Sequence, residues 1–173
     1  AFMGDKNTIC LLGFIGSGKT TVGKKLSQKI KKPFFDLDLE IEKAERLTIS
    51  EIFDKQGEAY FREQESIILQ KIISNNNGFV LSLGGGTPCY LQNMELINNS
   101  GISIYLKYNA GILASRLKGA KTERPLIKDL DKNELEEFIS GKLVEREFFY
   151  KQASHQIESN NVRVEDLLSI FLT

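Results

Sequence analysis

One short segment constrains the fold of this chain more than any other: residues 13–20 read Gly-Phe-Ile-Gly-Ser-Gly-Lys-Thr. This spacing is that of the phosphate-binding loop, whose glycines let successive backbone N–H groups point at one phosphate. An apolar run over residues 9–12 predicts a buried strand before the loop, and the residues from 19 onward predict a helix after it. Strand, loop and helix in that order indicate a nucleotide-binding α/β fold. The alternative is a glycine-rich turn that carries Gly-Lys-Thr by chance.

The loop also predicts which residues would bind a nucleoside triphosphate. Lys19 can reach the outer phosphates, and the hydroxyl of Thr20 can bind Mg²⁺. The expected nucleotide-binding residues of the loop are Gly16, Ser17, Gly18, Lys19, Thr20 and Thr21. ATP and Mg²⁺ are therefore the expected co-substrate and metal.

Composition narrows the classes of protein further. The 173 residues are enough for one domain with a proper core, so we expect a single domain over residues 1–173. Lys+Arg and Asp+Glu number 23 each, and the basic excess typical of a nucleic-acid-binding domain is absent. No apolar run approaches the roughly 20 residues that a membrane span needs. With Cys10 and Cys89 in no partner motif, we expect a reduced, cytoplasmic protein that binds neither nucleic acid nor membrane and is a monomer.

Strands and helices are expected to alternate along the chain. The expected strands are residues 9–12, 33–37, 79–83, 102–106 and 155–158. The expected helices are residues 19–31, 49–74, 91–98, 110–117, 132–152 and 165–172. Thr48 with Glu51 three residues later is a capping-box pattern, and Gly57 is expected to break the second helix in two. This alternation predicts a parallel sheet with helices on both faces.

The segment from 118 to 126 does not fit the alternation. It is polar, basic at three positions and bounded by Gly and Pro. An ordinary exposed loop is one interpretation. In a phosphate-loop protein, a basic loop before a long helix can instead close over the triphosphate. We expect a mobile lid over about residues 118–130, with Arg124 bringing a positive charge to the transferring phosphoryl group.

Three classes of phosphate-loop protein have to be separated. A GTPase normally carries Asn-Lys-x-Asp to bind guanine, and this tetrapeptide does not occur in the sequence. A motor-type ATPase normally has an apolar strand that ends in Asp, whereas the run over residues 79–83 is followed by three glycines. The small-molecule kinase is the class that remains.

Asp36 and Asp38 support a kinase, because they follow the second expected strand. In a parallel sheet, ligands gather outside the carboxyl ends of the strands. On a continuing strand, residues at i and i+2 point to the same side. One carboxylate could hold Mg²⁺, and the other could accept the proton of an attacking hydroxyl. The alternative is that these residues only cap the next helix.

The ordered set of motifs resembles the shikimate kinase family. The matching segments are GFIGSGKTTVGKKL, FFDLD, Ile52-Phe53, Gly57-Glu58, Phe61-Arg62 with Glu65, Ser82-Leu83-Gly84-Gly85-Gly86, Arg124-Pro125-Leu126, and Arg146 with Tyr150. They extend in order from about residue 8 to about residue 172. The resemblance implies a nucleoside-monophosphate-kinase-like, three-layer α/β/α fold with five parallel strands. It also implies transfer of the ATP γ-phosphoryl group to the 3-hydroxyl of shikimate, in the route to chorismate and aromatic amino acids.

The resemblance further implies an acceptor site that includes a helical segment over about residues 40–74. The residues implied to bind shikimate are Asp38, Arg62, Glu65, Gly84, Gly85, Gly86 and Arg146. Two arginines can each present a planar fork of donors to the shikimate carboxylate. Glu65 lies three residues after Arg62, so on a helix it can orient that guanidinium. The alternative for this pair is an ordinary surface ion pair.

The implied catalytic residues are Lys19, Asp38 and Arg124. Asp38 would hydrogen-bond the ring hydroxyls and act as the base for the attacking one, while Lys19 and Arg124 neutralise charge. Thr20 would bind Mg²⁺ directly and Asp36 would support it. Phe53 and Phe61 resemble aromatic walls beside the ring, or are plain core.

The adenine site is the least defined part of the resemblance. Family members usually place an arginine from the start of the lid against one adenine face, and a loop near the last helix against the other. A gap-free reading back from Arg124 puts Leu117 at the arginine position, so Arg116, Lys118 or an apolar contact can serve there. Arg116 is our choice, with residues 160–164 opposite.

Two rival functions remain open on the sequence. The first is a kinase for another small polyol acid, such as gluconate, which would not explain Arg62, Arg146 and the triple glycine together. The second is a regulatory nucleotide-binding domain without catalysis, against which Lys19, Asp38 and Arg124 argue.

Overall fold

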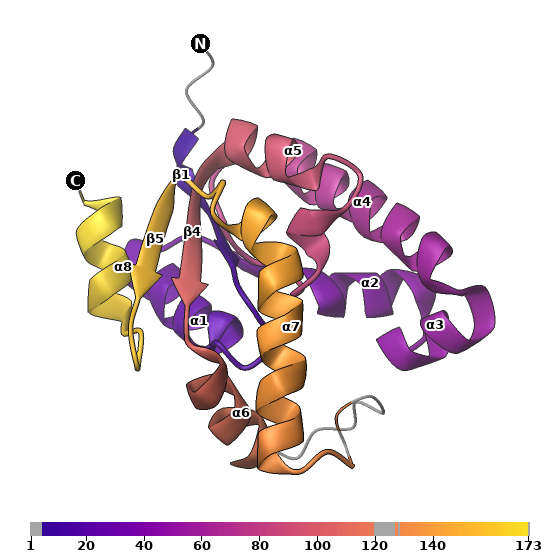
Figure 1. Cartoon of the computed structure of the whole chain (residues 1–173). Coiled ribbons are helices and arrows are strands. Elements are labelled where there is room, and N and C mark those ends of the chain that lie inside the picture. The colour runs from indigo at the N-terminus through magenta and orange to yellow at the C-terminus, as the bar shows by residue number, and fades with distance from the viewer. Residues whose placement is uncertain (1–4, 120–126, 128, 173) are drawn as a thin grey trace.

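A five-stranded parallel sheet forms the centre of the computed structural model, which describes residues 5–119, 127 and 129–172 (Figure 1). Its strands are β1 (Asp5–Leu12), β2 (Phe34–Asp36), β3 (Val80–Ser82), β4 (Gly101–Lys107) and β5 (His155–Glu158). Their order across the sheet is β2-β3-β1-β4-β5, and every neighbouring pair is parallel. The expected parallel α/β architecture with five strands is confirmed.

Helices follow the strands along the chain. They are α1 (Lys19–Ile30), α2 (Leu37–Glu45), α3 (Ile49–Gln56), α4 (Glu58–Asn75), the 3₁₀-helix η1 (Thr87–Cys89), α5 (Asn93–Ser100), α6 (Ala110–Gly119), α7 (Lys132–Tyr150) and α8 (Val164–Phe171). The expected capping box is present at Thr48, whose hydroxyl accepts from the backbone N–H of Glu51. Gly57 separates α3 from α4 with a φ of 86°, so the predicted break is also confirmed.

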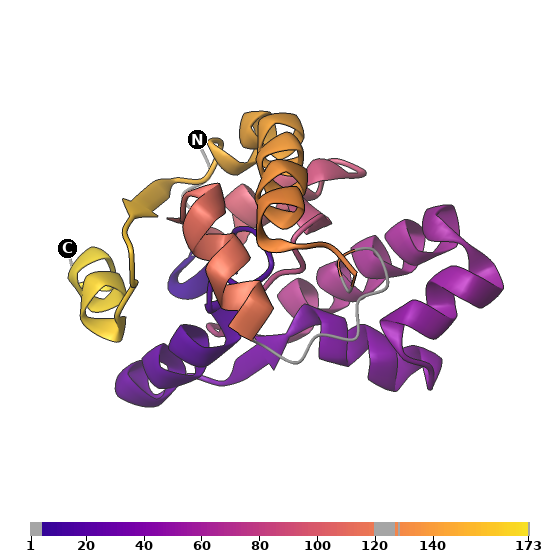
Figure 2. The same cartoon turned by 60° about the horizontal axis from the view of Figure 1, so that its bottom comes forward.

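The sheet separates two apolar clusters, one on each face. Strand β1 sends Ile9 and Leu11 to one cluster and Cys10 and Leu12 to the other, as the alternation of a strand requires. The first cluster contains side chains from α1, α6, α8 and the first half of α7. The second contains side chains from α2, α3, α4 and α5. Both views place α1 and α8 on the opposite side of the molecule from α2–α4 (Figures 1 and 2).

One boundary differs from the prediction. The second strand ends at Asp36, and Leu37 already belongs to α2. The prediction of a strand through residue 37, with both aspartates on one side of it, is therefore wrong. Asp36 is the N-cap of α2, where its carboxylate accepts from the N–H of Leu39, and Asp38 lies in the first helical turn. A carboxylate at the helix N-terminus favours this early start because it pairs a free backbone N–H group.

Two expectations lie partly or wholly outside the described residues. Arg124 and most of the predicted lid belong to residues 120–126 and 128, which the structure does not describe.

In the parts of the chain that are described, no helix combines the length and apolar character needed to cross a membrane.

Candidate active site

The phosphate-binding loop connects β1 to α1 and is built around its glycines and lysine. Gly16 and Gly18 have φ angles of 89° and 81°, a region that side-chain-bearing residues rarely adopt. The Nζ atom of Lys19 donates to the carbonyl oxygens of Gly13 and Phe14, at 2.8 and 3.1 Å. These bonds hold a buried ammonium group against the loop. The loop therefore concentrates positive charge and N–H dipoles where α1 begins.

Three oxygen-bearing side chains meet beside the first turn of α1. The hydroxyl of Thr20 donates to a carboxylate oxygen of Asp36 at 2.8 Å and lies 3.3 Å from the hydroxyl of Ser82. Thr20 and Asp36 were both predicted, and the interpretation of Asp36 as a helix cap also holds. Hydroxyl and carboxylate oxygens are the donors that Mg²⁺ prefers, so these residues fit that ion.

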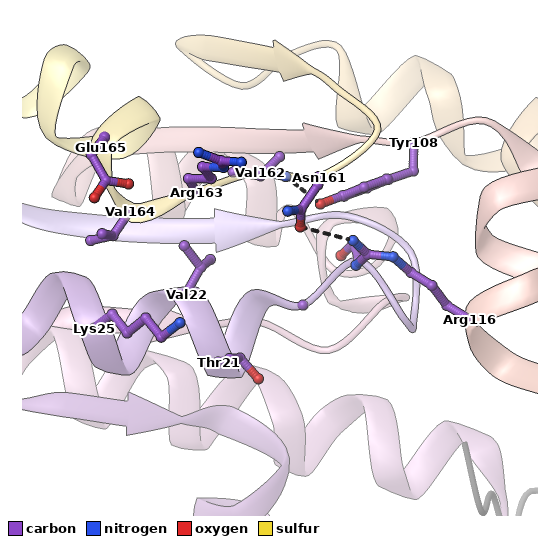
Figure 3. Close-up of a pocket in the computed structure, with 12 residues that line it drawn as sticks. Thr21, Val22, Lys25, Tyr108, Arg116, Asn161, Val162, Arg163, Val164 and Glu165 are labelled. Carbon is purple, nitrogen blue, oxygen red and sulfur yellow. Dashed lines mark hydrogen bonds between the residues drawn. The ribbon is translucent and has the colours of Figure 1, made fainter. Parts of the chain in front are cut away.

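A pocket of about 490 Å³ opens next to the loop, between α1, α6 and the segment before α8 (Figure 3). The guanidinium of Arg116 lies 4.4 Å from the ring centroid of Tyr108 and donates to the carbonyl of Gly16 and the side chain of Asn161. The hydroxyl of Tyr108 accepts from the N–H of Val162 at 2.7 Å. Arg116 and the segment over residues 160–164 thus form two parts of one pocket wall.

The two residues that follow Arg116 on α6 do not line this pocket. Leu117 is buried in the apolar cluster on the α1 side of the sheet, and Lys118 is exposed and outside the pocket lining. Of the three alternatives that the sequence left open, Arg116 is the one that contributes to this pocket. Thr21 also lines it, from the first turn of α1.

A second group of polar side chains lies on the other face of the sheet. Nη1 of Arg62 is 3.0 Å from Oε1 of Glu65, and the side chain of Glu65 is only 1 % exposed. The other carboxylate oxygen of Glu65 accepts from the hydroxyl of Thr87 at 2.8 Å. The alternative of an ordinary surface pair is therefore wrong, because the acidic partner is buried.

Burial and neighbouring groups act in opposite directions on the pKa of Glu65. Loss of hydration raises the pKa of Glu65, whereas the positive charge of Arg62 and the hydrogen bonds from Thr87 and Arg62 lower it. The nearby carboxylate of Asp38 raises it further. The net direction is upward, so the loss of hydration outweighs the effect of the two hydrogen-bond donors on this pKa.

The triple glycine after β3 brings the predicted acceptor residues together. A Cβ atom built on Gly84 would lie 3.0 Å from Oδ1 of Asp38, and one built on Gly86 would lie 2.6 Å from Nη2 of Arg62. A Cβ atom built on Gly85 would lie 3.2 Å from Nη1 of Arg146. The absence of side chains at these three positions leaves room for the charged groups.

Gly85 also joins the two halves of the site. The same Cβ position would lie 3.6 Å from the backbone nitrogen of Ile15 in the phosphate-binding loop. The carbonyl oxygen of Gly85 accepts a hydrogen bond from the hydroxyl of Tyr150, one turn after Arg146 on α7. Arg146 therefore lies close to the phosphate-binding loop, and its guanidinium is 5.4 Å from the ring centroid of Phe14 in that loop.

The two candidate aromatic walls have different surroundings. Phe61 is buried in the cluster on the α4 side of the sheet, so it is a core residue. Phe53 is half-buried, and its ring centroid lies 4.8 Å from that of Phe61.

Sequence reasoning missed three residues that the structure brings into the site. They are Ser82, Thr87 and Tyr108. Ser82 and Tyr108 carried a usable signal, since they lie at the carboxyl ends of predicted strands, where ligands of α/β proteins gather. Thr87 carried none, because its partner Glu65 is distant in the sequence.

The fold and the site together define the class of protein. The sheet is parallel with order 2-3-1-4-5, a phosphate-binding loop follows β1, and a separate cluster of arginines and carboxylates surrounds the glycines after β3. Together these features characterise a phosphate-loop kinase for a small molecule. The sequence profile of the family described as "Shikimate kinase" matches residues 15–172. The chain belongs to the shikimate kinase family, and it is an ATP-dependent phosphotransferase.

Individual relatives agree over nearly the full chain. A shikimate kinase from Flavobacterium psychrophilum is 44 % identical over 150 residues, which cover 86 % of this chain and 87 % of the relative. The crystal structure of shikimate kinase from Bacteroides thetaiotaomicron has a TM-score of 0.90 at 35 % identity, covering 96 % of this chain and 98 % of that one. A shikimate kinase from Acinetobacter baumannii in complex with shikimate has a TM-score of 0.81 at 34 % identity, covering 95 % and 90 %.

Proposed function

We propose that this protein transfers the γ-phosphoryl group of ATP to the 3-hydroxyl of shikimate, with the residues named above in defined roles. The observation that carries the proposal is the position of Gly85, between Arg146 on one side and the phosphate-binding loop on the other. An acceptor held by Arg146 would have its hydroxyl groups next to the phosphates. Positioning of this kind supplies much of the rate in phosphoryl transfer, because the transition state is loose.

The acceptor carboxylate would be held by Arg62 and Arg146. Each guanidinium can donate two parallel N–H bonds to a carboxylate, which fixes both its place and its orientation. Asp38 lies at the start of α2 beside Gly84, where its carboxylate can accept the proton of the attacking hydroxyl. The single carboxylate and several hydroxyls of shikimate match this arrangement.

On the nucleotide side, the loop from Gly16 to Thr21 would bind the phosphates through backbone N–H groups. Lys19 neutralises charge on the transferring group, and Arg124 is expected to add a second positive charge. Arg116 and residues 160–164 would hold the adenine ring between them.

Thr20 and Asp36 are the residues that would hold Mg²⁺. The described residues contain no group of three or more His, Cys, Asp or Glu that could hold a metal ion. That agrees with Mg²⁺ in nucleotide sites, which is bound through one or two protein oxygens plus the substrate phosphates. When bound, Mg²⁺ would neutralise charge that develops on the phosphate oxygens.

The test is release of ADP from Mg-ATP with shikimate, gluconate or a nucleoside monophosphate as separate acceptors. We expect turnover only with shikimate. Turnover with gluconate instead would establish the rival polyol-acid kinase. ATP binding without acceptor-dependent turnover would favour the regulatory domain.

A further inference from the structure

Thr87 occupies an unusual position, directly after the triple glycine and at the first residue of η1. Its side chain is completely buried, and its hydroxyl donates to Oε2 of Glu65 at 2.8 Å. Both members of this hydrogen bond are therefore removed from water. A buried hydrogen bond to a carboxylate is among the stronger neutral-to-charged contacts in proteins, and it is costly to leave unmade.

Glu65 divides its two oxygens between Thr87 and Arg62. Oε1 accepts from Nη1 of Arg62 at 3.0 Å, while Oε2 accepts from the hydroxyl of Thr87. The guanidinium also lies over the ring of Tyr90, 4.1 Å from its centroid. Arg62 also forms a longer ion pair, of 3.7 Å, with the exposed Glu58. Its buried partner is Glu65, and the hydroxyl of Thr87 fixes the other oxygen of that carboxylate.

The backbone of Thr87 is fixed as firmly as its hydroxyl. Its N–H donates to the carbonyl of Gly84 at 3.2 Å, and its carbonyl accepts from Nδ2 of Asn93 at 3.0 Å. Asn93 is the first residue of α5 and is itself 1 % exposed. These bonds connect α5 to η1. They fix the backbone of Thr87 and therefore the position from which its hydroxyl donates to Glu65.

We propose that Thr87 is a positioning residue for the acceptor: its hydroxyl holds the Glu65 carboxylate so that Arg62 faces the acceptor carboxylate. The inference rests on the proposed function and deepens it. Thr87 touches neither substrate in this scheme and acts through Glu65 alone. Its effect should appear in acceptor binding, rather than in ATP binding or in the chemical step.

The charges around Glu65 give this role a distinctive pH signature. The groups that face this carboxylate are Arg62 on α4, Asp38 on α2, and Thr87 and Cys89 in η1. Burial and Asp38 raise the pKa of Glu65, while Arg62 and Thr87 lower it. Removing the hydroxyl takes away one of the two lowering contacts, so the pKa rises. Glu65 then gains a proton, and loses its hold on Arg62, at a higher pH than in the unchanged protein.

The experiment compares Thr87→Val, which replaces the hydroxyl by a methyl group of similar size, with Thr87→Ser, which keeps it. The KM for shikimate, the KM for ATP and kcat are measured in the full chain from about pH 5.5 to about pH 8.5, spanning the range in which a buried carboxyl titrates. In Thr87→Val we expect the KM for shikimate to rise about tenfold near neutral pH, as for one lost hydrogen bond to a charged group. The acidic rise in this KM should move to higher pH, because the hydrogen bond that lowers the pKa of Glu65 is lost. The KM for ATP should stay within about twofold, and Thr87→Ser should keep the unchanged protein's profile.

A third variant shows whether the effect passes through Glu65. In Glu65→Gln the side chain cannot ionise, so adding Thr87→Val should not move the pH profile of that variant. If Thr87→Val does not fold, Thr87→Ala removes the same hydroxyl and takes its place in every comparison.

Two results would overturn the inference. One is a pH profile for the hydroxyl-free variant that superimposes on that of the unchanged protein. The other is a shift in Thr87→Ser equal to that in Thr87→Val, since a variant that keeps the hydroxyl would then behave like one that lacks it. Failure of the proposed function is a separate result, because the unchanged protein itself would show no shikimate-dependent release of ADP.

Discussion

The nucleotide side and the acceptor side of the proposed active site use different kinds of chemical group. On the nucleotide side, the contacts come mainly from backbone groups of the phosphate-binding loop, and Lys19 is tied to two of its carbonyls. On the acceptor side, the contacts come from charged and hydroxyl side chains, of which Glu65 and Thr87 are fully buried.

This difference determines how each side responds to mutation. A backbone N–H group remains in place when most side chains around it change, because every non-proline residue carries one. A buried side-chain network fails when one member is lost, since the remaining groups are left unpaired and out of water. Acceptor binding should therefore be the more fragile of the two functions, and four predictions test this comparison.

The largest effect should come from Asp38→Asn, at the border between the two sides. An amide keeps the shape of the side chain but cannot accept the proton of the attacking hydroxyl, so kcat should fall by about 10²- to 10⁴-fold. ATP binding, followed by a fluorescent nucleotide, should persist. Unchanged turnover would remove Asp38 from the mechanism.

Arg146→Ala tests the acceptor side directly. Loss of the guanidinium that we propose donates to the acceptor carboxylate should raise the KM for shikimate by about 10²-fold, while the KM for ATP changes little. Steady-state kinetics with each substrate varied in turn would measure both constants. Equal effects on the two would mean that Arg146 supports the fold or the nucleotide side instead.

Gly86→Ala tests how closely the acceptor side is packed. The new methyl group would lie 2.6 Å from Nη2 of Arg62, so the guanidinium must move, and the KM for shikimate should rise about tenfold. The φ of Gly86, −95°, is accessible to alanine, so the backbone itself is not strained.

Gly141→Ala on α7 is the matched control for that variant. A Cβ atom there meets nothing within 4 Å, and alanine should stabilise the helix by about 0.5–1 kcal/mol with unchanged kinetics. Thermal denaturation of both variants separates the two effects. A normal KM for shikimate in Gly86→Ala would show that the arginine tolerates displacement.

The smallest effect should come from Arg116→Ala on the nucleotide side. The half-buried guanidinium contributes one face of an open pocket, so the KM for ATP should rise only about fivefold, as for a single cation–π contact. The KM for shikimate should not change. A larger loss than in Arg146→Ala would reverse the comparison between the two sides.

The same contrast explains what could be predicted from sequence. The phosphate-binding loop is a contiguous motif, so its residues and the sheet around it were identified before the structure. Arg62 and Glu65 were paired correctly because three residues on a helix bring side chains together. Their burial was not predictable, because it depends on Thr87, which is 22 positions beyond Glu65 in the sequence.

One wrong prediction of the sequence analysis and one alternative that it left open have local physical causes. Phe34 and Phe35 with Leu37 resemble a strand, yet the carboxylate of Asp36 between them caps α2 and ends the strand one residue early. The interpretation of Arg62 with Glu65 as an exposed pair remained open because the helical spacing is the same on a buried face as on an exposed one.

The division of the apolar core into two clusters has a consequence for the evolution of this fold. The helices that carry the proposed acceptor residues Asp38, Arg62 and Glu65 pack on one face of the sheet, while α1, α6 and α8 pack on the other. Substitutions that reshape one face can accumulate while packing on the other is preserved. A duplicated copy could thus acquire a new acceptor and keep its nucleotide-binding residues. Strands β1, β3 and β4 and helix α7 contribute to both clusters, so both halves must continue to share them.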